Sequence, residues 1–142
     1  MKNATWSGRF KKGLDKEVLE FSESISVDHL LFDSDIKVCM AHAQMLCECK
    51  IITRSESNKI CKGLQKIQKK YHDGKLSLSI NLEDIHMNIE QALTKELGDL
   101  GKKIHMGRSR NDLVSTDLRL YLRDCVDLIL KKIKDTRYAI AI

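Results

Sequence analysis

The chain has 142 residues, which matches one domain and excludes two independent active domains. Its 42% apolar and 32% charged residues, with a net charge of +5 from 25 basic and 20 acidic side chains, are typical of a folded protein and exclude disordered and collagen-like classes. The five cysteines form no C-x-x-C pair, which argues against a zinc site or a thioredoxin-like motif and favours reduced thiols in a cytoplasmic protein.

The order of the predicted elements indicates an all-α protein. No proline interrupts the chain, and apolar residues recur at spacings of three and four over most of its length. The expected elements are an irregular arm over residues 1–14, a short helix near 15–24, helices over about 33–50 and 54–74, an extended connector over 76–82, a helix ending at Gly98, a loop over 98–111 and a long helix from about 112 past 132. No apolar run approaches the ~18 residues of a membrane span, so no membrane partner is expected.

Apolar stripes predict which face of each helix is buried. They are Ile36, Met40, Ala43 and Cys47; Ile60, Leu64, Ile67 and Tyr71; Ile85, Ile89, Leu93 and Leu97; and Val114, Leu118, Tyr121, Cys125 and Leu128. The first two stripes belong to helices joined by few residues, which predicts an antiparallel pair. The last helix exceeds about 30 Å at ~1.5 Å per residue, so we expect it to pack in a bundle larger than this chain.

Capping residues predict where these helices begin. Thr53 and Glu56 have the spacing of a capping box, in which each side chain accepts a hydrogen bond from the other residue's backbone. Asp33 or Ser34 is expected to cap the helix before it, and Asn81 the helix after it.

A basic loop leading into the last helix is the strongest candidate for a binding site. It reads Gly107-Arg108-Ser109-Arg110-Asn111-Asp112. Free backbone donors at a helix start, together with arginine side chains, attract carboxylates or phosphates. The alternative is that the arginines are solvated and that Asn111 or Asp112 only caps the helix, and spacing alone leaves both open.

Two further polar segments are weaker candidates. In Glu83-Asp84-Ile85-His86, the imidazole of His86 shares a helical face with Glu90, which can orient it, while Asp84 points elsewhere. One histidine among scattered carboxylates is a poor metal site, so none is expected, and a solvated helix start is the alternative. The other segment, Ser24-Ile25-Ser26-Val27-Asp28, reads as a helix end and turn that either faces a ligand or caps a helix.

Four segments together resemble the N-terminal part of the argininosuccinate lyase family in order and spacing. They are Trp6-Ser7-Gly8-Arg9-Phe10, Ser24-Ile25-Ser26-Val27-Asp28, Glu83-Asp84-Ile85-His86 and His105-Met106-Gly107-Arg108-Ser109-Arg110-Asn111-Asp112, and the resemblance covers residues 4 to about 130. It implies an N-terminal helical domain of the fumarase and aspartase superfamily over residues 1–111 and the start of a long central-bundle helix over 112–142. It also implies a cytoplasmic homotetramer without cofactor or metal.

The resemblance implies cleavage of argininosuccinate to arginine and fumarate by anti elimination. Ser24 and Asp28 are then expected at the arginine-like moiety, Asp84 and His86 beside the substrate, and Ser109, Arg110 and Asn111 at the succinate carboxylates, with Arg108 structural. The family's general-acid histidine and its base serine belong beyond residue 142. We therefore expect no catalytic residue and no activity in the 142 residues alone.

Two departures from the family pattern keep an alternative open. Met106 and Leu113 stand where the family usually has threonine and glutamine. They favour, as the alternative, a truncated or degraded helical relative that serves only as a structural or self-association module. An RNA-binding domain would rest on the charge of the lysine-rich hairpin and the basic loop alone, and no nucleic-acid partner is expected.

Overall fold

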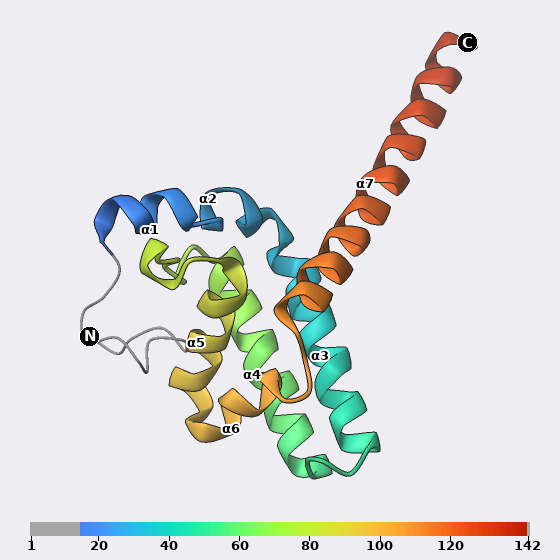
Figure 1. The fold of residues 1–142 in the computed structure, drawn as a ribbon. Helices are drawn as coiled ribbons and strands as arrows, with labels where there is room; N and C mark the ends of the chain where they lie inside the picture. Colours follow the sequence, from blue (N-terminus) through green and yellow to red (C-terminus); the bar gives the residue numbers. More distant parts are fainter. Residues whose placement is uncertain (1–14, 142) are drawn as a thin grey trace.

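The computed structural model describes residues 15–141, and all regular structure in this range is helical (Figure 1). The elements are α1 (Lys16–Ser22), α2 (Ile25–Asp28), the 3₁₀ turn η2 (His29–Leu31), α3 (Phe32–Glu48), α4 (Arg54–His72), η3 (Ile80–Leu82), α5 (Ile85–Leu97), α6 (Asp99–Lys102), η4 (Lys103–His105) and α7 (Arg110–Ile140). The all-α fold class is confirmed. The expected arm over residues 1–14 lies outside the described residues. No described helix has both the length and the apolar character needed to cross a membrane.

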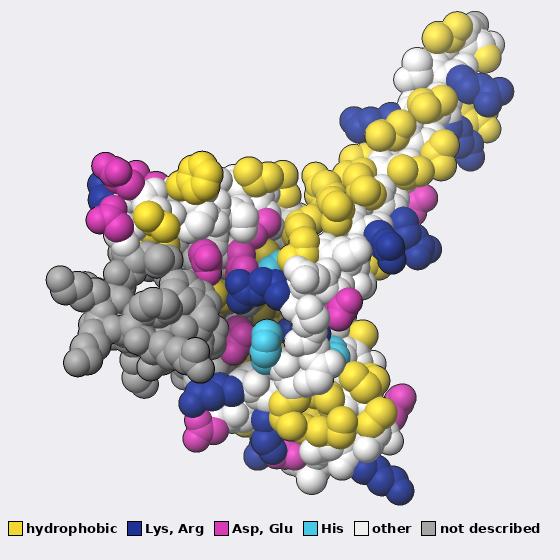
Figure 2. Space-filling view, viewed as in Figure 1, with side chains coloured by type: hydrophobic (Ala, Val, Ile, Leu, Met, Phe, Trp, Pro, Cys, Tyr) yellow, Lys and Arg dark blue, Asp and Glu magenta, His cyan; other side chains and the backbone are white. Residues whose placement is uncertain are grey.

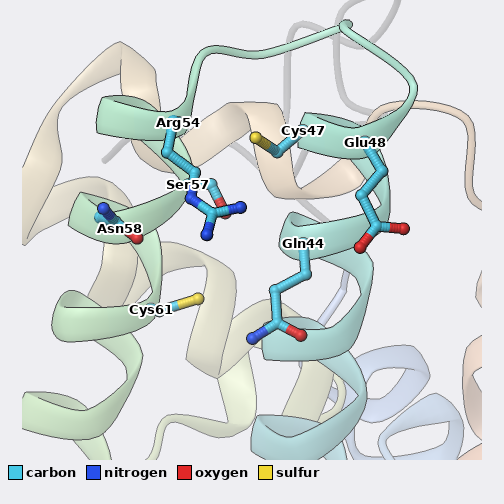
Figure 3. A pocket seen from close by; sticks show the side chains of 7 residues that line it. All are labelled: Gln44, Cys47, Glu48, Arg54, Ser57, Asn58 and Cys61. Atoms are coloured by element: carbon cyan, nitrogen blue, oxygen red, sulfur yellow. The ribbon is translucent and has the colours of Figure 1, made fainter.

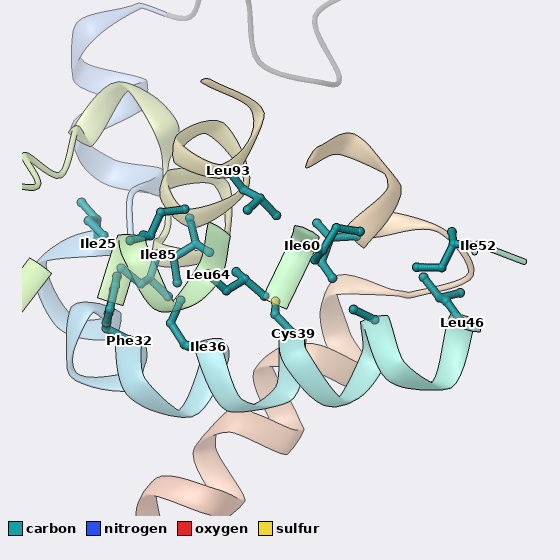
Figure 4. Close-up of a cluster of buried hydrophobic side chains, with 14 residues drawn as sticks. Ile25, Phe32, Ile36, Cys39, Leu46, Ile52, Ile60, Leu64, Ile85 and Leu93 are labelled. Carbon is teal, nitrogen blue, oxygen red and sulfur yellow. The ribbon is translucent and has the colours of Figure 1, made fainter. Parts of the chain in front are cut away.

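Helices α3 and α4 pack together as the predicted hairpin and carry most of the hydrophobic core (Figure 4). Every residue of their two predicted stripes is buried or packs partly buried against that core. At the end of the pair, the ring of Phe32 stacks on that of Tyr71 with centroids 3.8 Å apart. Because burying a large apolar side chain contributes about 1.5–3 kcal/mol, the stripes alone determine which faces of these helices meet.

Helix α5 packs against α4 with its predicted stripe inward. Ile85, Ile89 and Leu93 are buried, and Leu97 packs partly buried against the same core. The helix ends at Gly98 as predicted, and this glycine adopts φ +64, a left-handed conformation that other residues rarely reach. The expected extended connector before α5 is correct for Leu76 and Leu78, which contact the core, but its end folds into the η3 turn.

The capping box at the start of α4 is confirmed. Thr53 Oγ1 accepts the Glu56 backbone N–H at 3.2 Å, and Glu56 Oε2 accepts the Thr53 N–H at 2.7 Å. The prediction of Asp33 or Ser34 as the cap of α3 is wrong. The η2 turn runs directly into α3 at Phe32, so both residues lie inside the helix.

The predicted cap of α5 is also wrong. Asn81 lies within the η3 turn, and Asp84 caps α5 instead by accepting the Met87 N–H at 2.8 Å. The chain reaches this cap through Glu83, which adopts φ 67 and redirects the backbone between the turn and the helix. The start of α5 is thereby set three residues later than the sequence suggests.

The region predicted as a loop over residues 98–111 is partly helical. It contains α6 and η4, whose side chains Leu100 and Ile104 pack into or against the core. Apolar anchors four residues apart are enough to fold one turn once the chain has reversed at Gly98. Only the last part, residues 106–109, connects to α7 without regular structure.

Helix α7 has 31 residues and confirms the predicted long helix. Its buried residues are Leu113 and Asp117, close to its start, where it packs against α3. Further along, Lys37 of α3 pairs with Asp124 at 3.0 Å, and beyond this point the helix projects away from the other helices (Figure 1). Apolar side chains line the projecting part (Figure 2), including Val126, Ile129 and Ile133, each about half exposed.

Substituting Thr53 with alanine is expected to lower the free energy of unfolding by about 1 kcal/mol, because the first turn of α4 loses a hydrogen-bond acceptor for its free N–H groups. Urea denaturation followed by circular dichroism measures this loss. The matched control is Ser55→Ala in the same exposed first turn, which should change the stability little. Equal losses in both variants would contradict a capping role for Thr53.

Candidate functional site

The turn over Ser24–Asp28 is fastened to the start of α5. Ser24 Oγ donates to Asp28 Oδ2 at 2.6 Å, and the backbone N–H of Ile85 donates to Asp28 Oδ1 at 3.1 Å. The N–H groups of Ser24 and Ile25 both donate to the carbonyl oxygen of Glu83, at 2.8 and 3.1 Å. The left-handed Glu83 thus presents its carbonyl to this turn, and two of the predicted polar segments lie side by side.

The start of α7 is tied to the same place. Asp84, while capping α5 through one carboxylate oxygen, accepts a hydrogen bond from Arg110 Nη1 through the other. The Asp84 side chain is 9% exposed and that of Arg110 is 35% exposed, so the pair lies at the edge of the core with the guanidinium partly open to solvent. The Asp84 carboxylate thus joins the start of α5 to the start of α7.

The remaining loop residues lie at the helix start. Ser109 caps α7, since its Oγ accepts the Asn111 N–H at 3.3 Å, so neither Asn111 nor Asp112 is the cap that the alternative interpretation of this loop required. Extended backbone at Ser109 lets its hydroxyl reach back over the first turn, which a residue inside the helix cannot do. Ser109 and Asn111 are both exposed, and the Ser109 hydroxyl hydrogen remains available as a donor.

Beneath this surface, His86 lies in a buried cluster with two carboxylates from other helices. Its Nδ1 forms a short hydrogen bond with Asp35 Oδ2 of α3 and lies 3.6 Å from Asp117 Oδ2 of α7. The side chains of all three are 5% exposed or less. Within the described part of the chain, His86 Nε2 and both carboxylate oxygens of Asp117 have no hydrogen-bond partner.

The cluster shifts the ionisation of its members. Burial lowers the pKa of His86, but the hydrogen bond and charge of Asp35, with the charges of Asp84 and Asp117, outweigh this, so the net shift is upward. Burial, reinforced by the charge of Asp35, raises the pKa of Asp117 from 3.8 to about 7, against the opposing charges of His86 and Arg108. The two residues therefore both favour their protonated forms.

Arg108 is joined to this cluster through a cysteine. Cys39 Sγ donates to Asp35 Oδ1 at 3.0 Å, and Arg108 Nη1 donates to Cys39 Sγ at 3.2 Å. Burial and the charge of Asp35 raise the pKa of the Cys39 thiol, although Arg108 opposes them. Arg108 thus contacts the interior, whereas Arg110 pairs with Asp84 at the start of α5.

Comparison with known proteins identifies the family. A family model described as "Lyase" matches residues 8–141. The chain belongs to this lyase family. It is 48% identical over 139 residues to the argininosuccinate lyase of Nitrosococcus oceani, covering 96% of this chain and 30% of that protein. It is 51% identical over 130 residues to the argininosuccinate lyase of Staphylococcus carnosus, covering 92% of this chain and 28% of that protein. It is 50% identical over 139 residues to the argininosuccinate lyase of Ruthia magnifica subsp. Calyptogena magnifica, covering 98% of this chain and 29% of that protein.

The resemblance to argininosuccinate lyases stated from four motifs is thereby confirmed. The chain spans about three-tenths of the length of these relatives. In this chain, three of the motifs meet at the junction of α2, α5 and α7 described above.

The sequence did not single out Asp35 and Asp117, and it named the wrong partner for His86. Glu90 does not orient the imidazole, because it lies 3.6 Å from His105 instead. Asp35 fills that role from α3. The sequence feature that could have indicated them is an acidic residue next to buried apolar positions. Asp35 precedes Ile36 of the first stripe, and Asp117 lies one helical turn after Leu113. Charged residues at such core positions are rare unless they are paired.

A polar hollow of about 330 Å³ lies elsewhere in the chain, between the end of α3 and the start of α4 (Figure 3). Gln44, Cys47, Arg54 and Asn58 are among its lining residues. None of the predicted site residues lines it. The predicted residues instead occupy the junction of α2, α5 and α7.

Proposed function

We propose that this chain is the substrate-binding portion of an argininosuccinate lyase, which cleaves argininosuccinate to arginine and fumarate by anti elimination. The observation that supports this most directly is the Arg110–Asp84 pair. It joins two motifs that lie 26 residues apart in sequence, beside a third one fastened to the same helix start. Relatives of about 50% identity over most of this chain are named argininosuccinate lyases.

The start of α7 has the chemistry that a succinate carboxylate requires. Arg110 offers a guanidinium, and Ser109 and Asn111 offer neutral donors next to the positive end of the α7 dipole. In the proposed elimination, a base removes a proton from carbon and the resulting negative charge spreads into a carboxylate. Donors fixed in advance around that carboxylate stabilise this state most strongly.

The other predicted residues are proposed to serve the rest of the substrate. Ser24 and Asp28 bind the arginine-like moiety, and Asp84 and His86 line the substrate from α5. The general acid that assists departure of the guanidinium, and the base that takes the proton, are proposed to come from outside the 142 residues. No cofactor or metal takes part in the proposed reaction.

The proposed assembly is a cytoplasmic homotetramer, in which residues 112–142 join a central bundle and residues 1–111 form the N-terminal helical domain. The support is the apolar surface along α7, where Leu118, Leu122, Val126 and Ile133 are 46–52% exposed. Exposed apolar residues repeated along one helix are typical of an interface.

The decisive experiment is a chimera in which this chain replaces the matching part of the Nitrosococcus oceani argininosuccinate lyase. We expect the chimera to release fumarate from argininosuccinate, measured by ultraviolet absorbance. Arg110→Ala should lower kcat/KM by about 100-fold, since an interaction with a charged carboxylate is lost. The control is Lys102→Ala, an exposed cation that pairs only locally with Asp99, and it should retain activity.

A folded, tetrameric chimera without activity would contradict the proposed function. It would favour the alternative, a non-catalytic module, for which the departures at Met106 and Leu113 are the reason. In the structure Leu113 is buried and Met106 is 43% exposed. Leu113 therefore packs into the foot of α7, which argues that this departure repacks the interior without removing a group from the loop.

A further inference from the structure

We propose that Asp35 is a positioning residue, which fixes one proton on Nδ1 of His86 and so makes Nε2 the ring nitrogen that meets an acidic ligand. The inference rests on the proposed function for the identity of that ligand, a carboxylate of the succinate moiety. Its structural part concerns only this chain and is tested on it separately.

The orientation of His86 follows from its hydrogen bond. Asp35 Oδ2 bonds Nδ1, and a carboxylate can only accept, so Nδ1 carries the hydrogen in both the neutral and the cationic ring. The other carboxylate oxygen of Asp35, Oδ1, accepts a hydrogen bond from the Cys39 thiol at 3.0 Å. Cys39 Sγ in turn accepts a hydrogen bond from Arg108 Nη1 at 3.2 Å. These hydrogen bonds hold the Asp35 carboxylate in place, and the carboxylate in turn orients the His86 imidazole.

The charges around the ring favour its cationic form. Negative charges act on it from each helix packed there. Asp35 on α3 and Asp117 on α7 lie next to the ring, and the charge of Asp84 acts from its own helix α5. The positive charge of Arg108, from the loop, acts on Asp117. The Nε2–H of a cationic His86 is buried and has no acceptor within residues 15–141. A buried donor is costly to leave unpaired, and an anionic oxygen is the partner that matches it.

Nitrogen NMR of the ¹⁵N-histidine-labelled chain tests this directly. In the unchanged chain we expect His86 to carry hydrogen on Nδ1 throughout and to gain its second proton at Nε2, with a raised pKa. Asp35→Asn should lower this pKa and allow hydrogen to move to Nε2 in the neutral ring. The matched control is Asp33→Asn at the exposed His72–Asp33 pair, 3.0 Å apart, which should leave the signals of His86 unchanged.

Asp117→Asn serves as a second variant. It removes the negative charge that Asp117 carries above its pKa of about 7, at 3.6 Å from Nδ1, and it leaves the hydrogen bond to Asp35 in place. The pKa of His86 should therefore fall while the hydrogen stays on Nδ1. Circular dichroism verifies that each variant is folded. The proposal is overturned if the neutral His86 ring of the unchanged chain carries its hydrogen on Nε2. It is equally overturned if Asp35→Asn changes neither the position of that hydrogen nor the pKa of His86. It is also overturned if added zinc displaces the Nδ1 proton, since the cluster is then a metal site.

Kinetics of the chimera test the role toward the ligand. Asp35→Asn should lower kcat/KM about 10- to 100-fold and displace its pH profile, since a small loss of alignment is enough for such a decrease. Asp33→Asn should change neither. An unchanged profile in Asp35→Asn overturns the positioning role. An inactive parent chimera contradicts the proposed function instead, while the NMR result continues to decide the position of the proton.

Discussion

Asp117→Asn is expected to stabilise the protein at pH 8 by up to about 4 kcal/mol and to have little effect near pH 4. Burial raises the pKa of Asp117 from 3.8 to about 7, so between these values the folded state binds a proton that the unfolded state has lost. The stability due to this proton is complete below the unfolded pKa and is lost as the pH rises through about 7. At 1.36 kcal/mol per pKa unit, the loss is about 4 kcal/mol. Asparagine resembles the neutral carboxyl group but cannot ionise, so the variant avoids this loss of stability at high pH.

His86 changes stability in the same direction. Its pKa is raised in the folded state, so its contribution is complete below the ordinary value of 6.5 and is lost as the pH rises through the folded value. Because Asp117 and His86 interact, the titration measures the pair. Urea denaturation from pH 5 to 8 compares the variant with the unchanged chain, and exposed Asp127→Asn on the same helix is the control. A variant less stable at pH 8, or a difference independent of pH, would refute the prediction.

Gly101→Ala is expected to lower the free energy of unfolding by about 3 kcal/mol or more, despite the better helix propensity of alanine. A Cβ at Gly101 would lie 2.7 Å from the Leu93 carbonyl oxygen and 2.8 Å from Thr94 Cα. These are backbone atoms of α5, so the clash is relieved only if α6 moves away from α5. Ile104, buried one turn later, would then lose its packing.

The control for Gly101 is Gly63→Ala on α4. Its Cβ would lie 2.9 Å from Leu93 Cδ1 and 3.1 Å from Leu97 Cδ1, which are the ends of flexible side chains. These can move by a few tenths of an ångström, so a smaller loss is expected. Thermal unfolding of both variants gives the comparison, and a Gly101→Ala protein as stable as Gly63→Ala would show that α6 does not need its close approach.

The helices could be predicted because burial repeats with the helical period. The stripes of α3, α4 and α5 lie in the core where spacing placed them. The turns between them could not be predicted, because they depend on contacts made only after folding. Glu83 adopts a left-handed conformation that favours glycine, and its carbonyl is satisfied by Ser24 and Ile25, some 60 residues away. Nothing in the local sequence indicates this arrangement.

The candidate site shows the same division. Arg110 and Asp84 were named from the sequence, but their pairing was not, since it joins two separate segments. Asp35 was missed because a carboxylate on an amphipathic helix is usually solvated, and only the approach of His86 from another helix accounts for its burial. Sequence patterns thus identified the candidate residues Asp84, His86 and Arg110, while their partners on other helices could be identified only from the structure.

Helix α7 contains neither glycine nor proline between Arg110 and Ile140, so it has none of the usual points at which a helix bends. The left-handed Gly107 lies just before it. The helix is therefore expected to be stiff along its length, and it carries Arg110 and Asp117 close to its start. Because Asp117 lies 3.6 Å from the His86 imidazole, we expect contacts made along the far part of α7 to constrain the groups at its start as well.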